Sequence, residues 1–590
     1  NGFATNDLGA DVEVRTGKVS ILDFHMSDPW SDIVLPSFGM RYENGRSFRD
    51  FVRNVSLQGQ IADSRIDTRT LEHFIPALHG KEVSADVSAS SFLGPVNSLS
   101  INGMSFHNRD GVSGSADIRW SGLTERNRMQ ADLNVRRIDF TTAGIDRLLS
   151  GLMPGKEIGI GRYAHGESFA FSGRAHGPVN RLAVKGHLKS SSGEASADLT
   201  VTDLLNGRLS PAVKGAIDTR DLDIGQVLNL GFVHNVTMRT VVEAKKEGTM
   251  SFKVDSLRVE KINILDYDYT GIAGAGVFSG NAFDGRVICS DPNLNFIFQG
   301  IFNFSKKTSN AIYKFFFNLG YADLNALHID KRGTSKASLA VNANFMRVVK
   351  GDMIGDIGIN GIQLENDEGT HNIGNISISS HASDNINRIN LTSSFAEGTY
   401  VGTRPVTDVV DAILETTVRR SLPALAGVAG DWTGDNYRIN FRFSDSRDLL
   451  SFVMPGLYIA DGTSLKSTIT SEGKTSLSMT SQRLAFKDKF LKDLKVTMND
   501  IGDTIRVKSS EMNLSGIRLR DSEIKLHSGS DHIDLSGSFD NGSDSHSRGM
   551  VHLISDMTRN TAGDLTIDYD KHQVLMNGEN AHLTVNDAKD

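Results

Sequence analysis

The sequence predicts a mainly β protein, built as an elongated and repetitive antiparallel sheet with short amphipathic helices at the repeat junctions. Short stretches such as Ile376–Ser379 and Ile389–Thr392 alternate apolar and polar residues, which is the period of a strand with one wet and one dry face. Turn signals such as Asp110-Gly111 separate these stretches, because glycine tolerates the backbone conformations that tight connections need. Similar short segments also recur along the chain, which indicates a repeated unit.

Short helices are expected near residues 68–78, 143–153 and 322–328. The clearest helical spacing places one apolar face on Ile145, Leu148, Leu149, Leu152 and Met153. Pro154-Gly155 then ends the segment, because proline cannot continue a helix and glycine is typical just past its end.

A longer amphipathic helix is expected within an insertion at 401–430. Pro405 suits its first turn and Pro423 stops it. Its apolar face consists of Val406, Val409, Val410, Ile413 and Leu414. Such a helix packs on the sheet, plugs a groove or lies on a membrane surface, and its mixed acidic and basic polar face lacks the lysine-rich character that anionic lipid favours.

Internal similarity supports a repeat. Leu148–Gly155 recurs as Leu449–Gly456, and Gly94–Leu99 recurs as Gly177–Leu182. The predicted unit is a short helix followed by several strands, roughly 80 residues long, and such units stack in one dimension. The predicted division is a repetitive β-groove segment at 1–400, the helix insertion at 401–430 and a second β-groove segment at 431–590.

Composition excludes several classes of protein. The 590 residues contain 63 Lys and Arg against 71 Asp and Glu, a net charge of -8, which argues against a nucleic-acid-binding surface. The single cysteine, Cys289, excludes an internal disulfide and a cysteine-based zinc cluster. No stretch approaches the ~18 consecutive apolar residues of a membrane-spanning helix. The start at Asn1, with no signal peptide, indicates a processed or excised piece.

Motifs for catalysis are poor. Gly159–Ala164 fits a dinucleotide fingerprint in its letters, but the residues after it do not open a helix. Asp266–Gly271 resembles the start of a calcium loop, but the twelfth position is Val277, which cannot ligate a cation. Cys289 sits in strand-like sequence, as a small hydrophobe does. We therefore expect no enzyme activity, no catalytic residue, no metal site and no cofactor.

The most aromatic surface of the chain is expected on one hairpin. Alternate positions from 294 to 304 and from 313 to 321 are apolar, so each strand has an apolar face. The predicted lining residues are Leu294, Phe296, Phe298, Phe302, Phe304, Phe315, Phe317 and Leu319, and Tyr313 and Tyr321 are placed on the same face. This face is the core of a β-sandwich, the contact surface beneath a covering helix, or the dry interior of a curled sheet filled by a hydrocarbon ligand.

Five segments together suggest a known family: Ser64–Asp67, Leu71–Leu78, Gly94–Leu99, Tyr321–Leu327 and Ser393–Tyr400. They resemble the TamB-type members of the AsmA-like family, which are bridge-like lipid transport proteins of the periplasm of double-membraned bacteria. The resemblance covers nearly the whole chain. The family's amino-terminal membrane helix and a certain copy of its carboxy-terminal domain are not found, so the chain is similar to a middle section.

The resemblance implies a sheet curled into a U-shaped hydrophobic groove that carries phospholipid between membranes. It implies a non-enzymatic conduit that shields acyl chains and supports outer-membrane biogenesis as part of a translocation and assembly module. The implied partners are phospholipid or another acyl lipid and a TamA-type outer-membrane barrel protein. The implied location is periplasmic, with inner-membrane anchoring through a helix absent from this chain.

Two alternatives to the lipid conduit remain at this point. In the first, the chain is a structural scaffold that binds a TamA-type barrel protein through sheet edges and carries no lipid. In the second, the chain is an envelope hydrolase, which requires a clustered acid, base or metal site that the sequence does not show.

Overall fold

The computed structural model divides into two compact units, Asn1–Pro292 (unit 1) and Asn293–Asp590 (unit 2). Most described residues of both units lie in strands, so the predicted mainly β, open, antiparallel and repetitive character is confirmed. The structure describes residues 4–73, 78–125, 128–152, 167–203, 212–228, 231–247, 249–304, 311–347, 353–383, 385–404, 434–499, 504–514, 516–528, 532–540, 548–559, 565–576 and 579–583.

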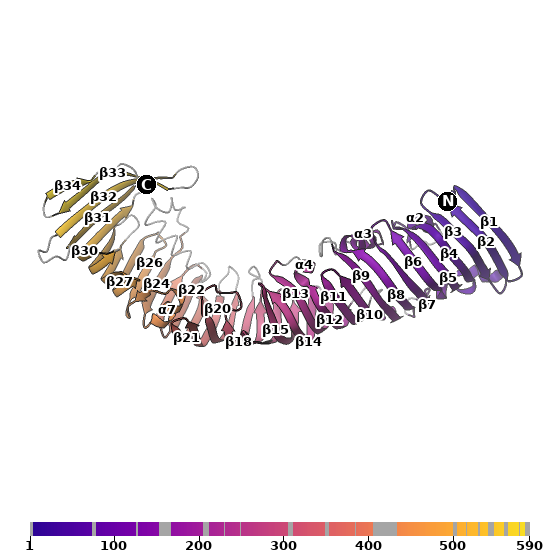
Figure 1. The fold of residues 1–590 in the computed structure, drawn as a ribbon, viewed down its shortest axis with the longest axis horizontal. Helices are drawn as coiled ribbons and strands as arrows, with labels where there is room; N and C mark the ends of the chain where they lie inside the picture. Colours follow the sequence, from indigo (N-terminus) through magenta and orange to yellow (C-terminus); the bar gives the residue numbers. More distant parts are fainter. Residues whose placement is uncertain are drawn as a thin grey trace. The chain divides into compact units, whose positions relative to one another are not determined.

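Unit 1 is an antiparallel sheet in which strands pair in the order of the sequence (Figure 1). Hairpins therefore connect almost every neighbouring pair, which is why turn residues recur so regularly. Its strands are β1 Asp7–Arg15, β2 Lys18–Ser27, β3 Asp32–Arg41, β4 Ser56–Asp67, β5 Ser84–Pro95, β6 Ser100–Asn108, β7 Ser113–Ser121, β8 Gln130–Thr141, β9 Ser168–Pro178, β10 Arg181–Ser190, β11 Gly193–Thr202, β12 Ala212–Asp223, β13 Val233–Glu247, β14 Thr249–Ile264, β15 Tyr267–Ser279 and β16 Ala282–Asp291.

Unit 2 follows the same plan with one exception. The short strand β25 does not lie between β24 and β26 in the sheet. Instead β24 pairs directly with β26, and β27 pairs with both β26 and β25. Its strands are β17 Leu294–Asn303, β18 Ile312–Asp323, β19 Lys336–Arg347, β20 Met353–Asn366, β21 Gly369–Ser383, β22 Ile386–Ser393, β23 Ala396–Gly402, β24 Tyr437–Phe443, β25 Leu457–Ile459, β26 Ser464–Ile469, β27 Thr475–Phe486, β28 Lys489–Met498, β29 Ile505–Leu514, β30 Ile517–Ser528, β31 His532–Asp540, β32 Arg548–Arg559, β33 Leu565–Met576 and β34 Glu579–Leu583.

Short helices mark the repeat in unit 1. Helices α2 (Thr68–Leu71), α3 (Thr142–Leu152) and α4 (Ile224–Leu228) follow β4, β8 and β12. Consecutive strands alternate in direction, so every fourth strand ends at the same edge of the sheet, and Figure 1 shows these helices along that edge. The helix starts are 74 residues apart (68 to 142) and 82 residues apart (142 to 224), which agrees with the unit predicted from the sequence.

The glycines of the repeated segments, Gly94 and Gly177, adopt the same backbone conformation. Each glycine is the second-to-last residue of a strand, β5 or β9, and a short connection then leads into the following strand. Their φ angles are +117° and +114°, which non-glycine residues rarely adopt. The matching sequence therefore encodes the same glycine conformation four strands apart, although η3 (Val96–Ser98) follows β5 and a two-residue turn follows β9.

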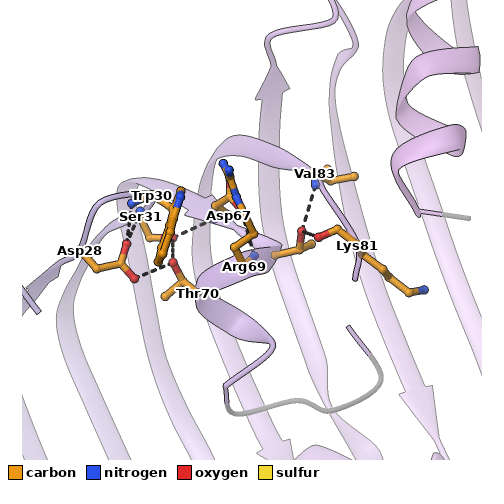
Figure 2. Close-up of polar contacts among 9 residues, drawn as sticks. Asp28, Trp30, Ser31, Asp67, Arg69, Thr70, Lys81 and Val83 are labelled. Carbon is orange, nitrogen blue, oxygen red and sulfur yellow. Dashed lines mark hydrogen bonds and ion pairs between the residues drawn. The ribbon is translucent and has the colours of Figure 1, made fainter. Parts of the chain in front are cut away.

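A buried polar network fixes the start of α2 against the β2–β3 turn (Figure 2). Ser31 Oγ donates to Thr70 Oγ1 at 2.7 Å, and Thr70 Oγ1 donates to Asp28 Oδ2 at 2.7 Å. Asp28 Oδ1 also accepts from the backbone N–H groups of Trp30 and Ser31. Because Thr70 is completely buried, each of these groups depends on the others for hydrogen bonds.

Asp67 caps the same helix. Its Oδ1 accepts from the Arg69 backbone N–H at 2.9 Å, and its carboxylate pairs with the Arg69 guanidinium, which also lies over the Trp30 ring (Figure 2). Thr68 then joins β5 to the helix, because its hydroxyl donates to Lys81 O and accepts from Val83 N. The junction is held by side-chain hydrogen bonds more than by apolar packing.

Helix α7 (Arg447–Val453) packs on the β20 and β21 hairpin of unit 2. The Arg332 guanidinium lies 4.7 Å from the centre of the Phe452 ring, and Asn366 Nδ2 donates to Ser451 O at 3.3 Å. This helix contains most of the repeated segment Leu449–Gly456, as α3 contains part of the first copy.

Two expectations about helices need comment. Residues 324–328 form consecutive turns and are not a helix, because the Asp323 carboxylate and carbonyl hold a single turn through Ala326 N and Leu327 N. The amphipathic helix predicted within 401–430 lies outside the described residues from position 405 onward, and the division at 400 and 430 stays a prediction. The remaining described helices are η1 Gly45–Asp50, α1 Phe51–Asn54 and η3 Val96–Ser98.

Candidate functional site: the apolar faces of the two units

An unbroken row of apolar residues and glycines crosses unit 1 at right angles to its strands. Residues paired across neighbouring strands point to the same face of a sheet, so the pairing places the whole row on one face. The row, from β1 to β16, is Val12, Ile21, Phe38, Gly59, Phe92, Ile101, Ile118, Leu133, Ala175, Val184, Leu199, Gly215, Val242, Val254, Gly276 and Gly285. We call this side the apolar face of unit 1.

Unit 2 contains a row of the same kind. It begins in the predicted aromatic hairpin and runs from β17 to β31 with no polar member. The row is Gly300, Phe315, Ala343, Ile357, Ile378, Leu391, Gly398, Phe441, Leu465, Met479, Val496, Val507, Ile524 and Gly537. We call this side the apolar face of unit 2.

The opposite, polar faces carry charged and hydroxyl side chains. In unit 1, Lys185 Nζ lies 2.8 Å from Asp198 Oδ2, and Arg174 Nε lies 2.9 Å from Asp132 Oδ1. In unit 2, one polar row is Ser377, Thr392, Glu397, Arg442, Ser464, Thr480, Lys495, Lys508 and Glu523. Exposed ion pairs contribute little to stability, so these rows chiefly keep one face wet.

Burial shows how open the apolar faces are. Nearly every member of both rows is half-buried, whereas a side chain between two packed layers is fully buried. Each strand contacts mainly the strands that pair with it, and within the described ranges no second sheet packs on either face. The principal buried apolar cluster of unit 2 is small and consists of Tyr400, Tyr437, Ile439 and Ile469.

The predicted lining residues share the apolar face of unit 2. Phe298 pairs with Phe317 and Phe296 pairs with Leu319, while Phe315 faces Gly300. The rings lie 5.6 Å apart for Phe296 and Phe317, and 5.5 Å apart for Phe298 and Phe315. These separations are typical of attractive ring contacts.

The residues at each end of the predicted lining also contact or pair with neighbours in this hairpin. Phe302 contacts the ring of Phe315 at 5.7 Å and that of Phe304 at 5.1 Å, and Phe304 follows β17 with 62% of its surface exposed. Leu294, at the other end, pairs with Ala322. The structure therefore brings together all eight predicted residues.

Tyr321 does not lie on this face, so that part of the prediction is wrong. Asn295 pairs with Tyr321 and the next residue, Phe296, pairs with Leu319, which leaves Gly320 without a partner on β17. This β-bulge shifts the alternation by one residue. Tyr321 consequently shares the polar face with Asn295, and Ala322 takes the apolar position.

The ionisable groups with displaced pKa values are mostly paired on the polar faces or at strand ends. A hydrogen bond from Arg174 outweighs desolvation and lowers the pKa of Asp132, and a hydrogen bond from Lys189 lowers that of Glu194. On the apolar face, burial raises the pKa of Tyr400 to about 12, and its hydroxyl donates to Arg404 O at 3.1 Å. These groups are stabilised in their ordinary charge states and are not activated for proton transfer.

Cys289 also lies on the apolar face, opposite Ile272. Its side chain is almost completely buried, and burial raises the pKa of the thiol. A raised pKa lowers the thiolate fraction, which is the nucleophilic form.

The described part of the chain contains no cluster of metal-binding side chains and no membrane-spanning helix. Its His, Cys, Asp and Glu side chains form no group of three or more that could hold a metal ion. None of its helices is both long and apolar enough to cross a membrane. What the apolar faces can do chemically is remove hydrocarbon from water.

Sequence reasoning missed most of the two rows. Phe92, Leu133 and Leu199 in unit 1, and Ile378 and Leu465 in unit 2, occupy equivalent positions to the predicted lining. The signal was present as alternation within each strand, but the alignment of one strand with the next depends on hairpin register, which bulges alter.

Comparison with protein-family models, curated proteins and solved structures gives no match to this chain.

Proposed function

We propose that this chain is a non-enzymatic lipid conduit whose apolar faces shield acyl chains from water. The observation that carries the proposal is the pair of unbroken apolar rows, one in each unit, on faces whose side chains stay only half-buried. A face built for internal packing needs a covering layer, whereas a face built for mobile hydrocarbon needs continuity across the strands.

The energetics favour such a use. Exposing an acyl chain to water costs about 0.8 kcal/mol per CH₂ group. A row interrupted by one polar residue would impose a local barrier on a lipid moving along it, because the polar group would lose water without gaining a partner. Neither row contains such an interruption among its members.

The biological setting that we propose comes from the resemblance. A TamB-type protein of the AsmA-like family would place this chain in the periplasm, with phospholipid as cargo and a TamA-type outer-membrane barrel as partner in outer-membrane biogenesis. The open, repetitive sheet supports the groove architecture of that proposal.

Photocrosslinking to lipid tests the proposal. A diazirine residue replaces Phe298 or Ile378 on the apolar face, and Asn295 or Ser377 on the polar face provides a matched control in the same strand. The purified chain is irradiated with vesicles of phosphatidylethanolamine and phosphatidylglycerol that carry radioactive phosphate. We expect labelled adducts at the two apolar positions and none above background at the two controls.

Equal labelling of both faces, or no labelling of a chain whose circular dichroism shows intact β structure, would contradict the conduit. In the second case the rows would serve protein contacts, and the scaffold alternative would take its place.

A further inference from the structure

Two aromatic rings on the apolar faces occupy the space beside a glycine on the neighbouring strand. A Cβ atom added to Gly186 would overlap Cε2 of Phe171 and lie 2.7 Å from its Cζ, and the three atoms nearest to it all belong to that ring. In unit 2, a Cβ atom added to Gly398 would lie 2.7 Å from Cδ2 and 3.1 Å from Cε2 of Phe441. Each ring occupies the space that any side chain larger than hydrogen would need.

The arrangement around Phe171 recurs within unit 1. Gly173 faces Gly186 across β9 and β10, and Phe171 leans over both from the same strand as Gly173. Phe283 leans in the same way over Gly285 and its partner Gly276. The shared pattern is a phenylalanine, a glycine two residues later and a second glycine opposite that one.

A ring that occupies the Cβ space of a glycine leaves more free space above the sheet than a ring that a side chain pushes outward. A ring in contact with glycine backbone lies close to the sheet surface, whereas a Cβ at the glycine would force it outward from that surface. At Gly186 and Gly398 the nearest atoms belong to the ring, and neither glycine has a positive φ. Alanine at either position should therefore displace the ring without straining the backbone φ angle.

We infer that the Phe171–Gly186 and Phe441–Gly398 pairs set the clearance above the apolar faces and so admit acyl chains at these points. The inference rests on the proposed function, because it assigns to these residues a positioning role for lipid. The acyl chains lie over the rings of Phe171 and Phe441, and the two glycines allow those rings to stay close to the sheet.

Alanine at each glycine tests the inference. In Gly186→Ala, a diazirine residue at Leu199, on the apolar face of the strand that pairs with the strand of Gly186, reports local lipid, and one at Ile101 in β6 reports lipid farther away. In Gly398→Ala the corresponding positions are Leu465, opposite Phe441, and Val341 in β19. We expect a loss of about fivefold in adducts at the near positions and unchanged adducts at the far positions, because the displaced ring takes up the lipid's space.

A control and a rescue separate this effect from loss of folding. Gly358→Ala places the same extra methyl on the polar face, where the nearest atom lies 3.8 Å away, and it should change no adduct. Phe171→Leu in the Gly186→Ala chain, and Phe441→Leu in the Gly398→Ala chain, should restore the near adducts because the ring is gone.

Unchanged near adducts in both alanine variants would overturn the inference, and so would a loss that the leucine substitutions fail to restore. Absence of adducts from the unsubstituted chain would instead overturn the proposed function, so the two failures are distinguishable.

Discussion

At the scale of single residues, the polar network below α2 shows how a sheet with little core holds its junctions. Thr70 is completely buried and connects Ser31 with Asp28 through its hydroxyl. Buried polar groups of this kind are stable only as a set, because each loses water on folding.

Thr70→Val keeps the shape of the side chain and removes its hydroxyl. The Asp28 carboxylate and the Ser31 hydroxyl each lose a buried partner, so we expect a loss of about 1–3 kcal/mol in local stability. Hydrogen exchange of the β2 to β5 amides measures it. Thr392→Val, at an exposed position on the polar face, should change stability by no more than about 0.5 kcal/mol, and equal effects of the two variants would refute the role of the network.

The Asp67–Arg69 pair predicts a dependence on pH at the same junction. Burial alone would raise the pKa of Asp67, but hydrogen bonds from the Arg69 side chain and backbone outweigh it, so the net pKa is lowered. A lowered pKa means that this stabilisation is present above the unfolded value, near 4, and is lost as the pH falls through the folded value.

Hydrogen exchange of the α2 and β5 amides, corrected for intrinsic rates, should therefore show protection that falls below about pH 4. Asp67→Asn removes the ionisable group and retains a capping oxygen. Because Arg69 is half-exposed, we expect a loss on the order of 1 kcal/mol at pH 7 and a flatter acid profile. An unchanged slope in the variant would show that other carboxylates control this region.

At the scale of the element, the repeated hairpins allow backbone conformation to be tested apart from packing. Gly177 has a φ of +114°, and an added Cβ would approach only Arg181 O, at 3.4 Å. Gly177→Ala should therefore cost about 1–3 kcal/mol through backbone strain. Local exchange in β9 and β10 is the measurement, with Gly231→Ala as a control because Gly231 has open space and no positive φ.

Gly94→Ala gives an internal comparison. Its φ is similar, but an added Cβ would overlap the carbonyl oxygen of Ser98, so the cost should exceed that of Gly177→Ala. The reverse order would mean that the two copies of the hairpin are not equivalent.

The elements also show what sequence could and could not predict. Alternation placed Phe298 and Phe317 correctly, because side chains in a strand change face with every residue. It failed at Tyr321, because the extra residue at Gly320 is recognisable only from the partner strands. The contact of Arg332 with Phe452 was also beyond prediction, since no local pattern links residues so far apart in the sequence.

At the scale of the whole molecule, each strand pairs with strands close to it in the sequence. Stability in such a protein is a sum of local terms and of terms between neighbours. A substitution that destabilises one strand should therefore lower the local stability of that strand and its paired neighbours only.

Leu133→Ala tests this expectation in the apolar row of unit 1. Because Leu133 is half-buried, we expect a loss of about 1–2 kcal/mol, below the usual range for a full core. Exchange should rise in β7, β8 and β9, and the amides of β26 to β30 should be unaffected. Asn134→Ala, on the polar face of the same strand, is the control, and a uniform rise through both units would refute neighbour-limited stability.

The helices at every fourth strand of unit 1 carry a consequence for how such a chain changes length. Two strands added together return the chain to the edge from which it left, so all later helices keep their side. One strand added alone would reverse the direction of every strand after it and send those helices to the opposite edge. Insertions and deletions in evolution should therefore come in even numbers of strands, and the length of the protein becomes a quantity counted in hairpins.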